Sequence, residues 1–261
     1  MKPQREIYLF RHGYSRANAL RHKKLSFQPF LLLIRKVFGF SFTLFLIQLL
    51  ELFKTGTILK RLADKDIPLE QIGILQSELT GKFLANRKIH PDLILCSDFL
   101  RTRETTQGIL KGIQSITEID HKDKIIYSSL IVERDGGIEF GYPLSYYPVL
   151  YPKTNEIYKT THRLDFKPPM GESIKDVRFK RIPNLIYLLN QFNSKTIFIV
   201  GHGITNSAIL SLLTDTELEK VKIGMENLGV YHLIEDISGK WLLDPNFSSG
   251  QRIDPSIPVT E

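Results

Sequence analysis

The residues best suited to chemistry are two histidines, each of which lies one residue beyond a short apolar run. His12 comes after residues 6–10, and His202 comes after residues 196–200, a run rich in β-branched side chains. Such runs are typical of buried strands. In an open α/β sheet, ligands bind beyond the carboxyl ends of the strands. We therefore expect both imidazoles to lie at one edge of a sheet.

Arginines accompany these histidines. Arg11 directly precedes His12, and Arg101 and Arg103 follow a third apolar run at residues 93–96. The planar guanidinium fork matches phosphate oxygens, and free N–H groups at a helix N-terminus strengthen the positive field. An imidazole that points at phosphorus can attack it and form a covalent intermediate. The sequence therefore predicts a site for a phosphate dianion with a histidine nucleophile.

The elements that must position these residues alternate along the chain. Strand and helix patterns predict helices at 15–25, 71–88, 99–111, 173–192 and 205–213, and further strands at 124–132, 230–234 and 241–243. Alternation of this kind implies a largely parallel sheet that is covered on both faces. We expect an α/β fold, a three-layer α/β/α sandwich with a mostly parallel central sheet. Residues 1–261 are expected to form a single domain.

Two regions interrupt this pattern. Residues 27–53, within an insert at about 20–63, are apolar and carry charge only at Arg35, Lys36 and Glu51. The uncharged run is short for a membrane span, and two cations in mid-membrane are costly. The insert is therefore expected to pack on the body as a helical cap, to lie in the interface of an anionic membrane, or to form a dimer surface. Residues 136–170 are rich in Pro, Gly and Tyr and predict a loop-rich cap.

Composition limits the partners. The 261-residue chain has a formal net charge of +7 and a pI near 9.3, which favours anionic partners. It has no run of five basic residues and no zinc-finger spacing, so nucleic acid is not expected as a partner. The single cysteine allows no internal disulfide, and the N-terminus lacks a signal-peptide pattern. We expect a cytoplasmic protein, with a peripheral membrane position as the alternative.

Four blocks of sequence resemble those of the histidine phosphatase superfamily, whose members are similar to phosphoglycerate mutase. The blocks are LFRHGYSRAN at 9–18, SDFLRTRET at 97–105, KPPMGESIKD at 167–176 and VGHGITN at 200–206. Between the first two, Asp66, Pro68, Leu69, Gly73 and Gln76 fit the family's linking pattern. The resemblance covers most of the chain except about 20–63 and 140–165.

The resemblance implies a role for each matching residue. His12 would attack phosphorus and carry it transiently, while Arg11, Arg101 and His202 would bind the phosphoryl oxygens and stabilise the transition state. Asn18 and Gly203 would assist in binding the substrate.

The resemblance also implies a carboxylic acid that protonates the leaving oxygen and later activates water. Glu133 falls where the family places this acid, and Asp135 and Glu139 are its rivals. The family chemistry needs no metal and no cofactor, although Asp64 and Asp66 form a candidate acidic pair. Cys96 ends an apolar run and is expected to be a buried small side chain.

The leading functional hypothesis is hydrolysis of a phosphomonoester through phosphohistidine at His12. One alternative is a mutase-type transfer that returns the phosphoryl group to a phosphoglycerate substrate. Another is a catalytically inert interaction protein docked on a membrane. The expected partner is a phosphorylated small molecule or lipid, and the apolar insert favours one with an apolar tail. The sequence indicates neither the exact substrate nor the oligomeric state.

Overall fold

A single six-stranded sheet organises the chain in a computed structural model, which describes residues 5–21, 28–55, 64–137, 146–247 and 249–253. Its strands are β1 (Glu6–Arg11), β2 (Leu93–Cys96), β3 (Ile125–Tyr127), β4 (Thr196–Gly201), β5 (Val230–Glu235) and β6 (Trp241–Leu243). They lie in the order β3-β2-β4-β1-β5-β6. The first four are parallel, whereas β5 and β6 are antiparallel to their neighbours. The predicted mostly parallel sheet is thus confirmed.

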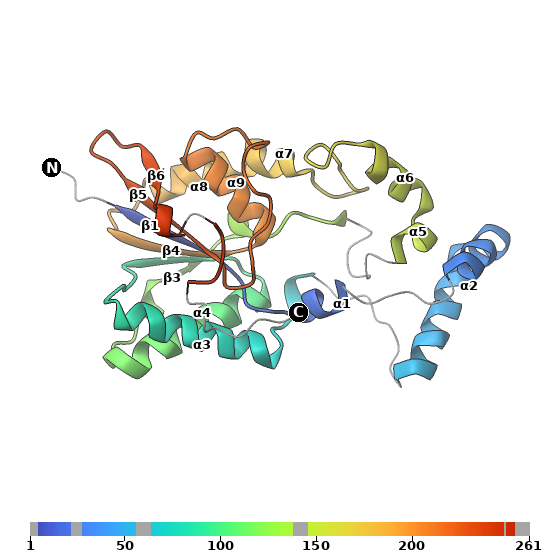
Figure 1. Cartoon of the computed structure of the whole chain (residues 1–261), viewed down its shortest axis with the longest axis horizontal. Coiled ribbons are helices and arrows are strands. Elements are labelled where there is room, and N and C mark those ends of the chain that lie inside the picture. The colour runs from blue at the N-terminus through green and yellow to red at the C-terminus, as the bar shows by residue number, and fades with distance from the viewer. Residues whose placement is uncertain (1–4, 22–27, 56–63, 138–145, 248, 254–261) are drawn as a thin grey trace.

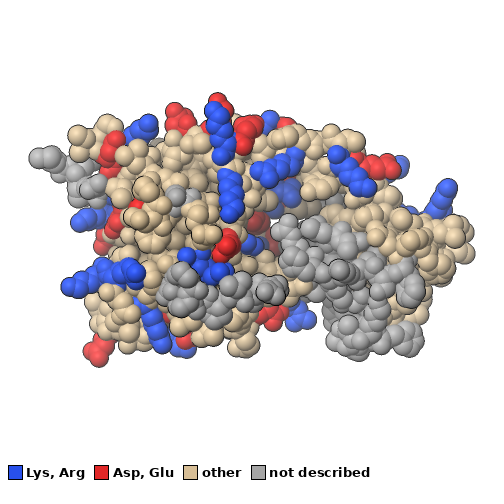
Figure 2. All heavy atoms as spheres, viewed as in Figure 1, with Lys and Arg blue, Asp and Glu red and all other residues tan. Residues whose placement is uncertain are grey.

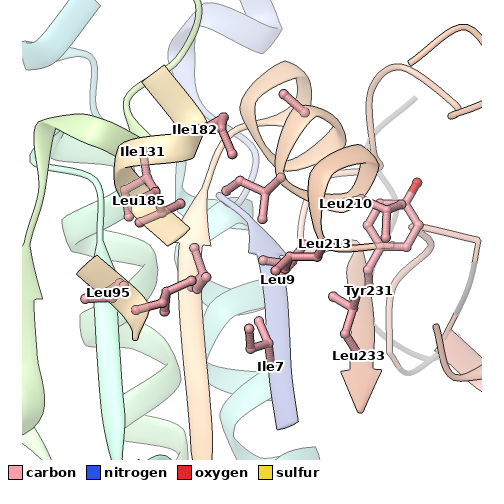
Figure 3. Close-up of a cluster of buried hydrophobic side chains, with 14 of the residues drawn as sticks. Ile7, Leu9, Leu95, Ile131, Ile182, Leu185, Leu210, Leu213, Tyr231 and Leu233 are labelled. Atoms are coloured by element: carbon pink, nitrogen blue, oxygen red, sulfur yellow. The ribbon is translucent and has the colours of Figure 1, made fainter. Parts of the chain in front are cut away.

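Helices cover both faces of the sheet, because the strands alternate two apolar sets of side chains. In β1, Tyr8 and Phe10 pack in the core beneath α3 (Gln71–Asn86) and α4 (Leu100–Thr117). Ile7 and Leu9 pack in a second core with α8 (Ile182–Leu189) and α9 (Gly203–Leu213). Figure 1 shows these two helical layers, and Figure 3 shows the second core. The three-layer α/β/α sandwich is confirmed.

Two elements differ from the sequence prediction. The strand predicted at 124–132 ends at Tyr127, because the Ser128 hydroxyl accepts a hydrogen bond from the Leu130 amide and turns the chain into a 3₁₀ turn, Ser129–Ile131. The helix predicted at 173–192 is divided into α7 (Ile174–Asp176), a π-helical turn (Val177–Arg181) and α8. Pro183 near the start of α8 has no N–H to continue a regular α-helical ladder, which accounts for the wide turn before it.

The two regions that interrupt the pattern each contain helices among their described residues. The insert contains α2 (Gln28–Thr55), which has a non-helical residue at Gly39, and the cap region contains α5 (Tyr147–Leu150) and α6 (Pro152–Thr160). Buried Leu31 and Ile47 of α2 share a small core with residues of α5. Of the helix predicted at 15–25, α1 spans Arg16–Arg21, Ser15 forms an isolated bridge with Leu69, and residues 22–25 lie outside the described residues. Short 3₁₀ turns occur at Asp64–Asp66, Lys122–Lys124 and Pro245–Phe247.

Candidate active site

Three neighbouring parallel strands end together and carry the candidate residues. β1 and β4 pair up to Arg11 and Gly201, after which the His12 amide still donates to the Gly201 carbonyl at 3.0 Å. On the other side of β4, the Ser97 amide donates to the Val200 carbonyl, also at 3.0 Å. This register places the rings of His12 and His202 edge to face, 5.2 Å apart between centroids. The sheet edge thus brings together the two histidines predicted to meet there.

His12 is held as a neutral base. Its Nδ1 lies 2.7 Å from the carbonyl oxygen of Gly13, which can only accept, so Nδ1 carries the proton and Nε2 keeps its lone pair. The pKa of the His12 imidazole lies well below its usual value because the ring is buried and because Arg101 and Arg11 lie nearby. A buried, unprotonated Nε2 is the form of histidine that can act as a nucleophile.

The loop after His12 is anchored to both helices on its side of the sheet. The Gly13 amide donates to Thr105 Oγ1 of α4 at 3.0 Å, and the Tyr14 amide donates to Gln76 Oε1 of α3 at 3.1 Å. Gly73 of α3 approaches so closely that an added Cβ would lie 2.2 Å from the Tyr14 carbonyl oxygen. The residues that the sequence identified only as a linking pattern therefore fix the position of the His12 loop.

Arg101, in the first turn of α4, is buried and already has an anionic partner. One of its terminal nitrogens, Nη1, lies 2.8 Å from Asp64 Oδ1 and donates to the Asp64 carbonyl oxygen at 2.7 Å. Burial raises the pKa of the Asp64 carboxyl to about 6, with Glu133 and Asp135 acting in the same direction and Arg101 against it. An incoming phosphate must compete with this carboxylate for the guanidinium.

His202 directly precedes α9, and only one of its ring nitrogens has a hydrogen-bond partner among the described residues. Its Nε2 lies 2.9 Å from Ser97 Oγ, and Phe99 packs edge-on against its ring. Among the described residues its buried Nδ1 has no hydrogen-bond partner. Burial lowers the pKa of His202 well below its usual value, and the charges of Arg101 and Arg11 add to this effect. A substrate oxygen can therefore be met by a neutral, unsatisfied imidazole nitrogen.

Arg11 and Gly203 complete the positive side of the site. The Nη1 group of Arg11 donates to the Met225 carbonyl, which orients the guanidinium across the end of β1. A Cβ on Gly203 would lie 3.6 Å from Arg11 Nε, so glycine leaves the N-terminus of α9 open beside this side chain. Backbone amides at such a terminus attract anions.

The three carboxylates proposed as the acid differ in their surroundings. Glu133 is half-buried, and its Oε1 lies 3.4 Å from Thr205 Oγ1 in the first turn of α9. Asp135 is exposed and its Oδ1 accepts the Gly137 amide at 2.7 Å, which commits it to a local turn. Glu139 lies outside the described residues. Glu133 Oε1 likewise accepts the Arg134 amide at 2.9 Å, so partial burial and the approach to Thr205 are what distinguish Glu133 from Asp135.

Asn18 has a clear role within the first block. Its Oδ1 accepts hydrogen bonds from the amide and the hydroxyl of Ser15 at 3.0 and 2.8 Å, and from Asn227 at 3.2 Å. The same Asn227 nitrogen lies 3.1 Å from the carbonyl oxygens of His12 and Gly13. Asn18 therefore holds the His12 loop in shape, and any contact with substrate would come in addition to this.

Four polar residues that were not predicted from the sequence contact the site: Asp64, Ser97, Thr105 and Thr205. Ser97 and Thr105 stand within the second matching block and Thr205 within the fourth, so their place in those blocks was the available signal. Asp64 lies just before the linking pattern and had been considered only as part of an acidic pair.

Two other chemistries find no support among the described residues. Cys96 is buried in the sheet core, and burial raises the pKa of its thiol to about 12, so it is not a ready thiolate. The described residues contain no group of three or more His, Cys, Asp or Glu side chains that could hold a metal ion. The chemistry available at this edge is that of imidazole, guanidinium and carboxylate.

Solved structures share this fold. An alpha-ribazole phosphatase from Shigella flexneri aligns with a TM-score of 0.66 over 95% of this chain and 98% of its own, at 15% identity. A mycobacterial glucosyl-3-phosphoglycerate phosphatase aligns with a TM-score of 0.62 over 92% and 97% of the two chains, at 17% identity. At these identities the similarity is one of fold.

Sequence comparison adds relatives with named activities. The chain is 32% identical over 114 residues to fructose-2,6-bisphosphatase TIGAR from Xenopus tropicalis, which is 43% of this chain but only 37% of the relative. It is 28% identical to a 2,3-bisphosphoglycerate-dependent phosphoglycerate mutase from Rhizobium etli, over 66% of this chain and 82% of the mutase. The family model of the histidine phosphatase superfamily (branch 1) matches residues 59–247. The chain belongs to the histidine phosphatase superfamily.

Proposed function

We propose that this protein hydrolyses a phosphomonoester through a phosphohistidine intermediate on His12. The observation that carries the proposal is the state of His12, whose Nδ1 is bonded to the Gly13 carbonyl while Nε2 is unprotonated, with the charges of Arg101 and Arg11 nearby. This arrangement supplies a nucleophile and the positive charge to receive a phosphate in one place. Activity in named relatives of the same superfamily supports the proposal.

In the first step, His12 Nε2 attacks phosphorus and the bond from phosphorus to the leaving oxygen breaks. Arg11, Arg101 and the free Nδ1 of His202 would bind the three phosphoryl oxygens, whose charge is spread in the transition state. His202 Nδ1 can serve as a donor only if the ring carries a proton there, and contact with the phosphate dianion favours that form. The N-terminus of α9 adds its dipole to the same pocket.

Glu133 is proposed as the acid and base. Protonated, it would give its proton to the leaving alkoxide; as a carboxylate, it would then take a proton from the water that attacks phosphohistidine. The second step breaks the nitrogen–phosphorus bond and releases inorganic phosphate with His12 restored. Glu133 lies beside Thr205 of the first turn of α9, and this position supports the role of Glu133 as acid and base.

The substrate class that we propose is a phosphorylated small molecule or lipid, with the enzyme peripheral on a cytoplasmic membrane surface. The insert and the cap lie outside the matching blocks. They would contact the part of the substrate beyond the phosphate. The apolar helix α2 in the insert supports a substrate with an apolar tail. We propose that residues 1–261 work as one domain with its insert at about 20–63 and its cap at about 136–170.

A mutase-type reaction is the second candidate, because the Rhizobium etli mutase matches over 82% of its length. In that reaction the phosphohistidine would pass its phosphoryl group to a second substrate hydroxyl instead of to water. The two candidates differ in what happens after the first step. A requirement for a bisphosphate primer and slow release of free phosphate would favour the mutase.

The deciding experiment is phosphate release from a panel of sugar, inositol, lipid, nucleotide and aryl phosphates without added metal. Wild-type protein is expected to release phosphate from a subset of these esters. His12→Ala should lose at least about 10⁴-fold in kcat, because without the nucleophile no phosphohistidine can form. Acid-labile, alkali-stable labelling of wild-type protein by a ³²P-labelled substrate would identify phosphohistidine. Full activity in His12→Ala would overturn the proposal.

A further inference from the structure

The most unusual surface of the molecule is the outer side of α2. Large apolar side chains project from it into solvent, with exposed fractions between 40% and 63%; they are Phe30, Leu32, Leu33, Val37, Phe38, Phe42 and Phe45. Figure 1 shows α2 at the end of the molecule far from the sheet, and in Figure 2 the described atoms at that end are almost all apolar or uncharged. A contiguous apolar surface of this kind marks an interaction site.

The inner side of α2 accounts for the rest of its apolar character. Leu31, Thr43 and Ile47 are fully buried, and the two apolar residues among them pack against Val149 and Leu150 of α5. The outer phenylalanines have no such cover among the described residues. The helix is therefore attached to the body along one side only, and its other side is built to meet something apolar.

Gly39 divides α2 into two segments. Its φ of 82° and ψ of −175° are open to glycine but strained for other residues, and the two helical segments meet there at a kink. Thr43 Oγ1 donates to the Gly39 carbonyl at 2.8 Å and satisfies this acceptor at the kink. The stretch Gln28–Leu50 is long and apolar enough to cross a membrane by length and composition. The kink in its middle does not suit a straight spanning helix.

The charges of α2 indicate which apolar partner fits. Between residues 28 and 50 the only charged side chains are Arg35 and Lys36, adjacent to each other and just before Phe38. Arg35 lies over the Phe40 ring, 5.5 Å from its centroid, and Lys36 is exposed. Long basic side chains beside apolar ones extend to the headgroup level while their stems remain in the apolar layer. The exposed Lys36 favours anionic lipid, and both cations disfavour the centre of a bilayer.

A second copy of the chain fits this surface less well. A two-fold interface centred near Phe38 would bring the Arg35–Lys36 pair of one protomer against the same pair of the other, since such interfaces are self-complementary. Like charges that face each other across an interface oppose association. A lipid surface of negative charge has the complementary sign.

We propose that α2 docks this protein on an anionic membrane surface, with both segments lying in one leaflet and the outer phenylalanines inserted below the headgroups. The inference rests on the peripheral location proposed above and extends it to a defined surface, but it does not depend on the chemistry of His12. Helices of this kind bind through buried apolar area together with attraction to anionic lipid.

The test measures co-sedimentation of the full-length protein with vesicles of phosphatidylcholine alone and with vesicles that also contain phosphatidylserine. Wild type is expected to bind the second kind more tightly. The double variant Phe38→Gln/Phe42→Gln should bind more than about tenfold more weakly, since each ring contributes apolar burial. Lys36→Glu should bind phosphatidylserine vesicles at least about fivefold more weakly and lose most of the salt dependence.

The matched control is Phe179→Gln, because Phe179 is 60% exposed and Phe38 is 58% exposed, but Phe179 lies outside α2. It should bind vesicles as wild type does, and an unchanged unfolding transition in each variant would show that binding alone has changed. Three results would overturn the proposal: equal binding by wild type and the double variant, a soluble dimer that the double variant dissociates, or resistance of the bound protein to alkaline extraction, which indicates a spanning helix. His12→Ala should bind vesicles normally, so failure of the catalytic proposal is seen separately in phosphate release.

Discussion

The sheet edge and the α2 insert are built by opposite means. At the sheet edge, polar side chains are buried and fixed by neighbours from several elements: His12 by its own loop, Arg101 by Asp64, and His202 by Ser97. In α2, apolar side chains are exposed and the helix is held through contacts with α5. The first region holds charged groups in a fixed geometry, whereas the second exposes an apolar surface with little cover from the rest of the described chain.

Within one chain, catalysis and membrane docking are thus assigned to separate regions. Catalysis requires groups that are preorganised before the substrate arrives, which the cross-strand register and the anchored loop supply. Docking on a fluid surface requires apolar area and charge but little precision. The two regions should therefore respond differently to substitution, and each can be tested without disabling the other.

The largest effect within the sheet edge, after loss of His12, is expected from Glu133→Gln. Loss of a general acid lowers kcat by about 10²–10⁴-fold for an alkyl phosphate, whose leaving alkoxide needs a proton. The loss should be much smaller for 4-nitrophenyl phosphate, whose leaving group needs none. Steady-state kinetics on both substrates measure the contrast. Asp135→Asn and Glu139→Gln are the matched controls, and the same leaving-group pattern in either of them would transfer the role.

Cavity-forming substitutions in the two regions should affect stability differently: one should lower the global free energy of unfolding and the other the free energy of local opening. Ile199→Ala in the sheet core is expected to lower the free energy of unfolding by about 2–5 kcal/mol, because Ile199 is fully buried between many neighbours. Ile47→Ala in α2 should mainly accelerate local opening of α2 and α5, since their small core is separate from the sheet. Denaturant unfolding and amide hydrogen exchange, followed by peptide, measure the two effects. Uniform acceleration of exchange across the sheet in Ile47→Ala would show that the regions are one cooperative unit.

A smaller effect is expected from Asp64→Asn, which removes the charge that occupies Arg101. At pH 7 wild-type Asp64 is largely ionised, because its pKa is about 6, so it competes with phosphate for the guanidinium. The variant should bind inorganic phosphate about tenfold more tightly as a product inhibitor, the size of a charge-assisted hydrogen bond. Below pH 6 wild-type Asp64 becomes neutral, so the ratio of the two inhibition constants should approach one.

The control for this change is Asp66→Asn, since Asp66 lies on the same 3₁₀ turn but is exposed. It should leave phosphate inhibition unchanged at every pH. Weaker phosphate binding in Asp64→Asn would mean instead that Asp64 holds Arg101 in place for the substrate.

Most of the fold could be predicted because its strands are short, apolar and directly followed by chemistry-bearing residues. β1, β2, β4, β5 and β6 were each expected within a residue of their observed ends. The end of β3 could not be predicted, because it depends on the Ser128 side chain and on an edge position in the sheet. The division of the helix before α8 was missed because a pattern of apolar spacing does not register a single proline.

Part of the site could also be predicted. The matching blocks identify the residues, and the rule that ligands bind at strand ends predicts that His12 and His202 lie at the same edge of the sheet. The ion pair of Asp64 with Arg101 depends on how the 3₁₀ turn packs against α4, a tertiary contact with no local pattern. The contact of Asn18 with Asn227, which lies 209 positions further along the chain, was hidden for the same reason.

The pairing of β1 with β4 has a consequence for the order of events during synthesis. Glu6 and Thr196 are in register although 190 positions separate them. At about 5–20 residues per second, a ribosome needs roughly 7–30 s to make the chain from the end of α2 to the end of β4. During that interval α2 has already emerged, while the sheet that anchors the rest of the protein has not closed. A membrane or a chaperone therefore meets the apolar helix before the catalytic sheet exists.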